Sequence, residues 1–112
     1  MHEYSLVMSL IERVDMEAQA KQAKSIRRIS IKVGELSGVE AELLSQAYEI
    51  ARTGTSCEHA ELTVTREPAR WACPNCQITL DASRSLRCAT CDAAGQLVAG
   101  GDLLFEQMEI EV

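Results

Sequence analysis

The chain has 112 residues; 46% are hydrophobic, 25% charged and 4% aromatic, and the formal net charge is −6 with histidine neutral. This length holds one compact domain and at most a small appendage, and the composition is that of an ordinary globular protein. The acidic balance argues against nucleic acid, whose binding needs a basic face. No apolar run approaches the roughly 18 residues that span a bilayer, and no secretory signal pattern is present. We therefore expect a cytoplasmic protein whose partners include no nucleic acid and no membrane.

The first half of the chain predicts a helix, a strand and a second helix. Apolar residues recur at helical spacing over about residues 4–22, namely at Val7, Leu10, Ile11, Val14 and Ala18. Residues 29–33 alternate between apolar and polar, which indicates a half-buried strand. A second helix is expected over about residues 39–53, with Gly54 as its stop. Its expected buried stripe consists of Val39, Leu43, Ala47, Ile50 and Ala51.

The second half predicts two more strands, separated by a segment of a different kind. Residues 61–66 read as a strand that ends before Pro68. Residues 104–112 alternate in the same way, with Leu104, Met108 and Ile110 on one face. The segment 70–100 breaks this pattern and carries four of the five cysteines. We therefore predict an α+β fold: a small three-stranded sheet with two helices, formed by residues 1–69 and 101–112, plus an inserted zinc-ribbon-like lobe with four cysteine ligands at residues 70–100.

Two CxxC knuckles, eleven residues apart, predict a zinc site formed by Cys73, Cys76, Cys88 and Cys91. Each pair can wrap a tight turn that aims both sulfurs at one point, and two pairs complete the tetrahedral shell that Zn²⁺ accepts. Four bound sulfurs leave no position open for water, so the site is expected to be structural and not catalytic.

Other uses of the cysteines are weaker. Disulfides do not suit the reducing cytosol, and thioredoxin-like chemistry uses one CxxC in a βαβ setting. An iron–sulfur cluster would also accept four thiolates. Cys57 lies beside His59 in a loop, where a metal pair or a nucleophile and base are conceivable. A plain loop cysteine and a solvated histidine are the simpler interpretation, and we assign neither a role.

Met1, His2 and Glu3 form a candidate chelating unit. A bulky second residue such as His2 generally blocks removal of the initiator methionine, which would leave an α-amine, backbone amides and an imidazole close together. Ni²⁺ and Cu²⁺ favour square-planar or tetragonal nitrogen sites, and imidazole can serve as a ligand near pH 7. Glu3 could add a carboxylate or orient the site. The ordinary alternative is a solvated terminal histidine without a function.

Taken together, the chain resembles the HypA/HybF family of hydrogenase nickel-maturation proteins. The resemblance covers essentially the whole chain and rests on several segments in a fixed order. They are Met1-His2-Glu3-Tyr4-Ser5-Leu6, Ile31-Lys32-Val33-Gly34-Glu35-Leu36-Ser37-Gly38-Val39, Gly54-Thr55, Ala60-Glu61-Leu62, the two knuckles and Met108-Glu109-Ile110-Glu111-Val112.

The resemblance implies a nickel metallochaperone and not an enzyme. In such a protein His2 would hold nickel, with contributions from Met1 and Glu3, while the four knuckle cysteines would hold structural zinc. The implied partners are a HypB-type GTPase and the large-subunit precursor of [NiFe]-hydrogenase, and in some members urease maturation proteins.

The chain departs from the family pattern at a few positions. Gln77 and Asp92 stand where family knuckles often have glycine, Leu80 and Leu86 where aromatic residues are common, and Asp102 where the family often has Glu. None of these positions is a proposed metal ligand. The rival interpretation is a zinc-ribbon interaction module for nucleic acid or a transcription complex, which the acidic charge disfavours.

Overall fold

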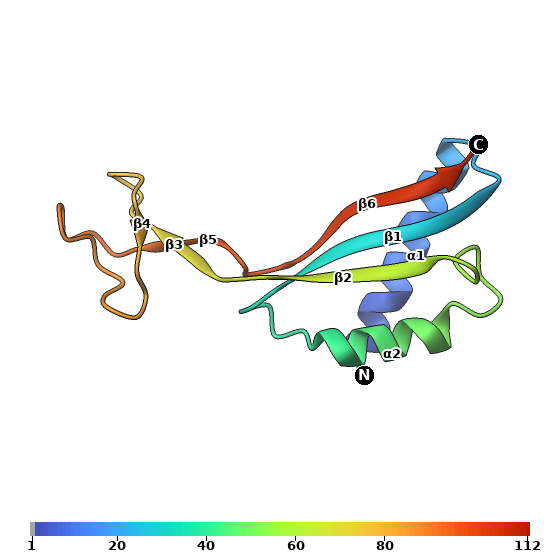
Figure 1. Cartoon of the computed structure of the whole chain (residues 1–112), viewed down its shortest axis with the longest axis horizontal. Helices are drawn as coiled ribbons and strands as arrows, with labels where there is room; N and C mark the ends of the chain where they lie inside the picture. Colours follow the sequence, from blue (N-terminus) through green and yellow to red (C-terminus); the bar gives the residue numbers. More distant parts are fainter. Residues whose placement is uncertain (1) are drawn as a thin grey trace.

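The molecule is elongated and contains two separate small sheets (Figure 1). The computed structural model describes residues 2–112, and its extents are 54 × 29 × 16 Å. The main sheet has the strand order β2-β1-β6 and the second sheet has the order β4-β3-β5. The elements in chain order are α1 (His2–Ala20), β1 (Ser25–Gly34), α2 (Ala41–Ala51), β2 (Glu61–Glu67), β3 (Arg70–Ala72), β4 (Thr79–Leu80), β5 (Gln96–Ala99) and β6 (Leu103–Glu111).

The main sheet joins the two ends of the chain through its central strand, β1. This strand pairs in parallel with β2, where Ile31 lies opposite Val64, and antiparallel with β6, where Ile31 lies opposite Phe105. A parallel pair needs a long crossover connection, and the segment containing α2 supplies it. The predicted α+β fold, with two helices, a three-stranded sheet and a cysteine-bearing second unit, is confirmed.

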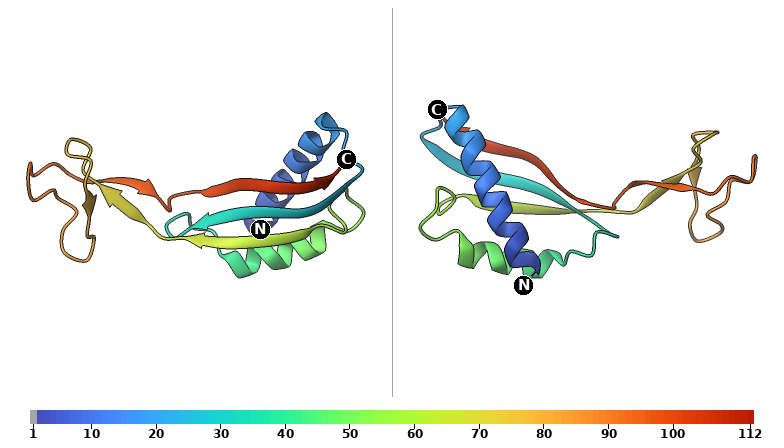
Figure 2. Two further views of the ribbon diagram at one scale, coloured as in Figure 1. Left: turned by 45° about the horizontal axis from the view of Figure 1, so that its top comes forward. Right: turned by 180° about the vertical axis from the view of Figure 1, so that it is seen from behind.

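Both helices contribute to one hydrophobic core on one side of the main sheet. In Figure 1 α1 lies behind the sheet, and in the right-hand view of Figure 2, which is seen from behind, α1 lies in front of it. The side chains that alternate with the core residues of β1, at Arg28, Ser30 and Lys32, are exposed or half-buried. The buried core comprises Val7, Leu10, Ile11, Val14, Ala18, Ile26, Ile29, Ile31, Val33, Leu44, Ala47, Tyr48, Ala51, Cys57 and Ala60. All five residues predicted for the buried stripe of the first helix belong to it.

The predicted buried stripe of the second helix was partly wrong. Leu43 and Ile50 are 46% and 69% exposed, while Leu44 and Tyr48 are buried. The reason is the phenol of Tyr48, which is buried and donates a hydrogen bond to the Ala60 carbonyl at 2.8 Å. Tyr48 therefore faces inward, and α2 turns to bury the stripe that Tyr48 shares with its i−4 and i+3 neighbours.

The strict alternation predicted for the last strand was also wrong. The pairing of β1 with β6 shifts between Ser30, opposite Gln107, and Ile31, opposite Phe105. A β-bulge of this kind adds one residue to a strand and reverses the faces beyond it. As a result Phe105 and Met108 both pack against the core, and Leu104 is exposed. No helix within residues 2–112 is long and apolar enough to cross a membrane.

Candidate metal centre

The four knuckle cysteines meet at one point of the second sheet region. The sulfurs of Cys73, Cys76, Cys88 and Cys91 all lie within 4.8 Å of one another, and the sulfurs of Cys73 and Cys91 are 3.4 Å apart. Tetrahedral Zn–S bonds of about 2.3 Å place ligand sulfurs about 3.8 Å apart. The spacing therefore suits a tetrahedral metal ion such as zinc. Cys73 and Cys88 are buried, whereas Cys91 is exposed.

Each knuckle is a tight turn closed by backbone hydrogen bonds. The N–H of Gln77 donates to the Cys73 carbonyl at 2.8 Å, and the N–H of Asp92 donates to the Cys88 carbonyl at 2.8 Å. Gln77 and Asp92 adopt φ angles of 58° and 60°, the left-handed region that favours glycine. The two positions at which the sequence lacks the glycine common in the resembled family are therefore positions that need this conformation.

Hydrogen bonding makes the thiols of Cys76, Cys88 and Cys91 unequal in pKa. The backbone N–H groups of Cys91 and Thr90 lower the pKa of the Cys88 thiol to about 6, and the N–H of Ala93 lowers the pKa of Cys91. The neighbouring thiols of Cys91 and Cys88 raise the pKa of Cys76 to about 12. Some thiols of the cluster therefore ionise readily, while others keep their protons. A bound divalent cation would displace these remaining protons and leave all four sulfurs as thiolates.

The N-terminal candidates lie apart from this cluster. The helix α1 begins at His2, whose side chain is exposed, and Glu3 is half-buried in its first turn. The predicted contribution of Met1 lies outside the described residues. Figure 1 places the start of α1 beside α2, far from the loops around β4 that carry the cysteines. The structure therefore does not bring His2 or Glu3 to the four thiols.

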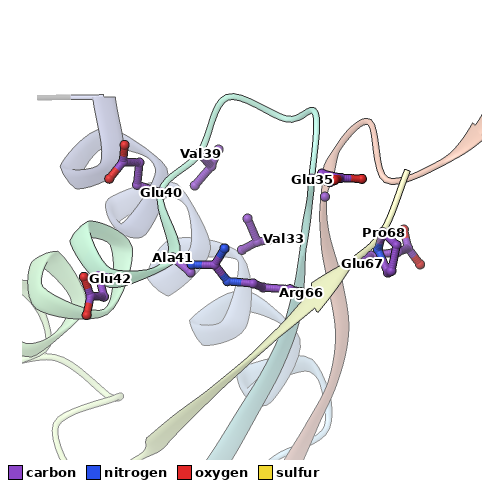
Figure 3. Close-up of a pocket in the computed structure, with 10 residues that line it drawn as sticks. Val33, Glu35, Val39, Glu40, Ala41, Glu42, Arg66, Glu67 and Pro68 are labelled. Atoms are coloured by element: carbon purple, nitrogen blue, oxygen red, sulfur yellow. The ribbon is translucent and has the colours of Figure 1, made fainter. Parts of the chain in front are cut away.

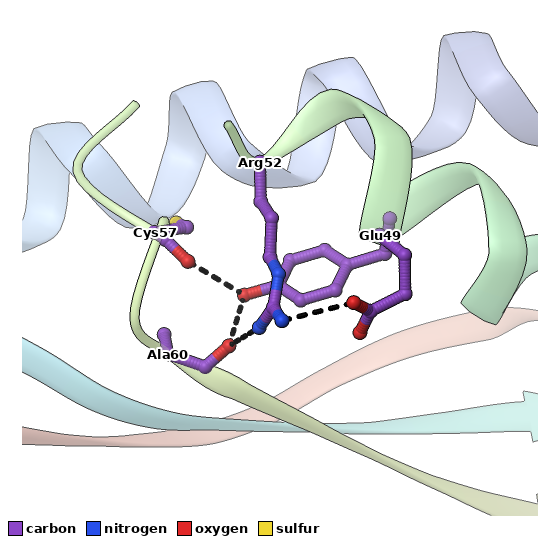
Figure 4. A network of polar contacts seen from close by, with 5 residues as sticks. Glu49, Arg52, Cys57 and Ala60 are labelled. Carbon is purple, nitrogen blue, oxygen red and sulfur yellow. Dashed lines mark hydrogen bonds and ion pairs between the residues drawn. The ribbon is translucent and has the colours of Figure 1, made fainter. Parts of the chain in front are cut away.

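Cys57 and His59 do not form a reactive pair. The Cys57 side chain is fully buried in the core, burial raises the pKa of its thiol, and His59 is exposed. The backbone around Cys57 is tied to α2 instead (Figure 4): the Tyr48 hydroxyl and the Arg52 guanidinium both donate to the Ala60 carbonyl, at 2.8 and 2.9 Å. Cys57 therefore lies in a loop, as predicted, and its buried side chain is also part of the hydrophobic core.

A groove of ≈ 500 Å³ lies between the end of the main sheet and the start of α2 (Figure 3). Its lining includes Glu35, Glu40, Glu42, Arg66 and Glu67. None of these residues was singled out from the sequence as functional. The signal available was the run Gly34-Glu35, which served only as part of the resemblance.

The fold and the four-thiol cluster define a small α+β metal-binding protein with a cysteine lobe. The family model described as "Hydrogenase/urease nickel incorporation, metallochaperone, hypA" matches residues 1–110. The chain belongs to this HypA family of nickel metallochaperones for hydrogenase maturation, as the resemblance predicted.

Curated relatives and solved structures agree with this assignment. "Hydrogenase maturation factor HypA" of Shewanella sp. (strain MR-7) is 40% identical over an alignment of 113 residues, and the match covers 99% of this chain and 96% of the relative. The protein of the same name from Aquifex aeolicus (strain VF5) is 32% identical over 114 residues, covering 100% and 99% of the two chains. The solution structure of the Ni metallochaperone HypA from Helicobacter pylori superposes with a TM-score of 0.76 at 26% identity, covering 97% of each chain. A second structure, "Solution structure of HypA protein", gives a TM-score of 0.81 at 28% identity, covering 98% of this chain and 96% of that one.

Proposed function

We propose that this chain binds Ni²⁺ at the start of α1 and helps to deliver it to the large-subunit precursor of [NiFe]-hydrogenase. The observation that carries the proposal is the family match over residues 1–110, because this span contains both His2 and the two CxxC knuckles. A carrier needs a site that selects its metal and also releases it. An exposed site at the end of a helix suits release better than a buried cage.

The first turn of α1 supports a nitrogen-rich nickel site. The first N–H groups of a helix have no intrahelical acceptor, so a metal that displaces their protons breaks no helical hydrogen bond. The helix starts at His2 and is anchored by Val7 and Leu10, both buried. The proposed ligands are the His2 imidazole with the backbone or side chains of Met1 and Glu3, a set that fits the nitrogen preference of Ni²⁺.

For the cysteine lobe we propose a structural Zn²⁺ held by Cys73, Cys76, Cys88 and Cys91. The zinc would fix the two knuckles and stabilise a lobe that has little hydrophobic interior of its own. Residues 1–69 and 101–112 would then act as a nickel-binding domain, and residues 70–100 as a zinc-binding lobe. Four thiolates persist where thiols stay reduced, so we place the protein in the cytoplasm.

The protein would act as a carrier and not as an enzyme. A HypB-type GTPase and the hydrogenase precursor are the proposed partners, with urease maturation proteins as further ones. Docking of a partner would supply competing ligands near His2, and nickel would pass by ligand exchange.

The decisive experiment is a nickel titration of the zinc-loaded chain with a native, untagged N-terminus. We expect wild type to bind about one Ni²⁺ in a nitrogen-rich site and the His2→Ala variant to lose this binding. The chain has two histidines, so His59→Ala is the matched control and should bind as wild type does. Absorption in the d–d region would report a square-planar nitrogen environment directly.

Equal nickel binding by wild type and His2→Ala would exclude the N-terminal site. A His2→Ala protein that still matures hydrogenase at limiting nickel would contradict its role in delivery. Either result would make the zinc-ribbon interaction module the leading interpretation. A salt-dependent gel shift with nucleic acid would then test that interpretation.

A further inference from the structure

Three backbone segments meet where the main sheet gives way to the cysteine lobe, and we call this region the neck: residues 34–36, 67–69 and 100–102. Figure 1 shows the ends of β1 and β2 and the beginning of β6 converging there. Three backbone hydrogen bonds join the segments. The N–H groups of Gly34, Glu35 and Leu36 donate to the carbonyls of Asp102, Glu67 and Gly100 at 2.9, 2.9 and 2.8 Å.

Two carboxylates add side-chain contacts to the same backbone. Glu35 Oε1 accepts the N–H of Ala69 at 2.7 Å, and Glu67 Oε1 accepts the N–H of Gly100 at 3.2 Å. Ala69 lies on the segment that enters the cysteine lobe, and Gly100 lies on the segment that leaves it. Each of the two connections is therefore held by a carboxylate from the main sheet or from the turn after it.

The neck is packed backbone against backbone. A Cβ atom at Gly34 would lie 2.4 Å from the Gly100 carbonyl carbon, and a Cβ at Gly100 would lie 2.6 Å from the Ala69 Cα. Gly100 also has a φ of 84°, which favours glycine. No residue of the described cysteine lobe belongs to the hydrophobic core of the main sheet. The lobe is therefore joined to the main sheet by the hydrogen bonds of the neck and not by shared apolar packing.

We propose that Glu35 and Glu67 are positioning residues that hold the cysteine lobe in one orientation relative to the main sheet. Hydrogen bonds from backbone N–H groups to carboxylates are stronger than those to neutral acceptors, and the bond from Ala69 to Glu35 is the shorter of the two. They fix both connecting segments at once, so the lobe can neither swing about one connection nor twist about the other. Glu67 is itself steadied by Lys32, 3.9 Å away. This role goes beyond the proposed nickel site and does not depend on it, because neither carboxylate is a proposed ligand.

The consequence concerns any partner that contacts both halves of the molecule. With the neck held, the cysteine lobe and the start of α1 are presented in a fixed arrangement, and binding loses little orientational freedom. With the neck released, the same two surfaces would have to be ordered during docking.

The test compares residual dipolar couplings of backbone amides in the zinc-loaded full-length protein. In wild type, the amides of α1, α2 and the main sheet and those of residues 70–99 should fit one common alignment tensor. In the Glu35→Ala/Glu67→Ala protein we expect two different tensors, with the lobe tensor reduced in magnitude by about two-fold or more. A common tensor in this variant would overturn the proposal.

Three controls separate orientation from general damage. Glu61→Ala removes an exposed carboxylate whose ion pair with Arg28, at 3.2 Å, lies at the far end of the same sheet, and it should keep the common tensor. Glu35→Gln/Glu67→Gln retains acceptor oxygens and should restore most of the wild-type alignment. Zinc content and amide dispersion within residues 70–99 should be unchanged in all variants. If the double alanine variant does not fold, Glu35→Ala takes its place, because Glu35 is exposed; it releases the entering segment at Ala69, and a common tensor in this variant would also overturn the proposal.

Discussion

Around the main sheet, the side chains of Ile29, Ile31 and Tyr48 are fully buried, whereas the buried hydrophobic side chains described within the cysteine lobe are only those of Cys73 and Cys88. The first region is held by apolar surface removed from water. The second has a small sheet, exposed Ile78 and Leu86, and four thiols at one point. If the proposed zinc is bound there, we expect the fold of the lobe to depend on it, as the folds of small zinc domains do. The comparison then predicts that one chain uses two independent sources of stability.

The largest effect should come from removing the metal. A strong chelator, or Cys73→Ser, should unfold residues 70–99 and leave the helices and main sheet intact, because structural zinc contributes about 10 kcal/mol or more to such lobes. Amide hydrogen exchange measured by mass spectrometry should show protection lost in the lobe alone. Cys57 is not a candidate ligand, so Cys57→Ala provides the control and should retain the metal. Loss of protection in α1 upon chelation would show that the stability of the main sheet also depends on the metal.

A cavity in the main core should destabilise the main sheet and leave the cysteine lobe unaffected. Ile29→Ala in the centre of β1, where the side chain is fully buried, should lower the free energy of unfolding of the main sheet by about 2–5 kcal/mol. Urea denaturation followed by helical circular dichroism measures this change, while the zinc content of the folded protein should stay the same. A metal-free lobe in folded Ile29→Ala protein would show that the two regions are coupled.

The knuckle turns should produce a smaller effect, confined to the lobe. Gln77→Val places a β-branched residue at a φ of 58°, where the zinc-loaded lobe should be about 1–2 kcal/mol less stable than with glycine at the same position. Competition with a zinc chelator should then remove zinc at a lower chelator concentration than in wild type. Gln77→Gly relieves the same constraint and should hold zinc at least as well as wild type does. Equal zinc retention by the valine and glycine variants would contradict this account of the turn.

The smallest effect concerns the polar contact behind α2. Tyr48→Phe removes the hydroxyl that donates to the Ala60 carbonyl and should lower stability by about 1 kcal/mol near neutral pH. Burial raises the pKa of Tyr48 to about 12 from 10.0. The unfolded phenol therefore ionises first, and wild type should lose this part of its stability as the pH rises from about 10 towards about 12. Denaturation midpoints at several pH values should show the gap between wild type and variant narrowing over this range; a gap that does not narrow would rule out the buried phenol as the cause.

Local patterns were enough to predict several parts of the fold. The five apolar positions of α1 at helical spacing are its buried residues, and Ile29, Ile31 and Val33 alternate inward as predicted. The spacing within and between the two knuckles predicted the thiol cluster, because a CxxC turn aims both of its sulfurs to the same side. These are short-range relations in which residues a few positions apart determine the outcome.

Other features depended on segments far apart in the chain. Leu43 and Leu44 are equally apolar, and the contacts of Tyr48 with the loop before β2 decide which of them is buried. The bulge in β6 arises from its pairing with β1, and Cys57 is buried because the loop after α2 packs its side chain into the core. The sequence by itself determined the helices, the three strands of the main sheet and the four-thiol cluster, since their signals are periodic or local. Only the tertiary structure decided the rotation of α2, the faces of β6 and the carboxylate contacts at the neck, because each depends on backbone groups more than ten residues away.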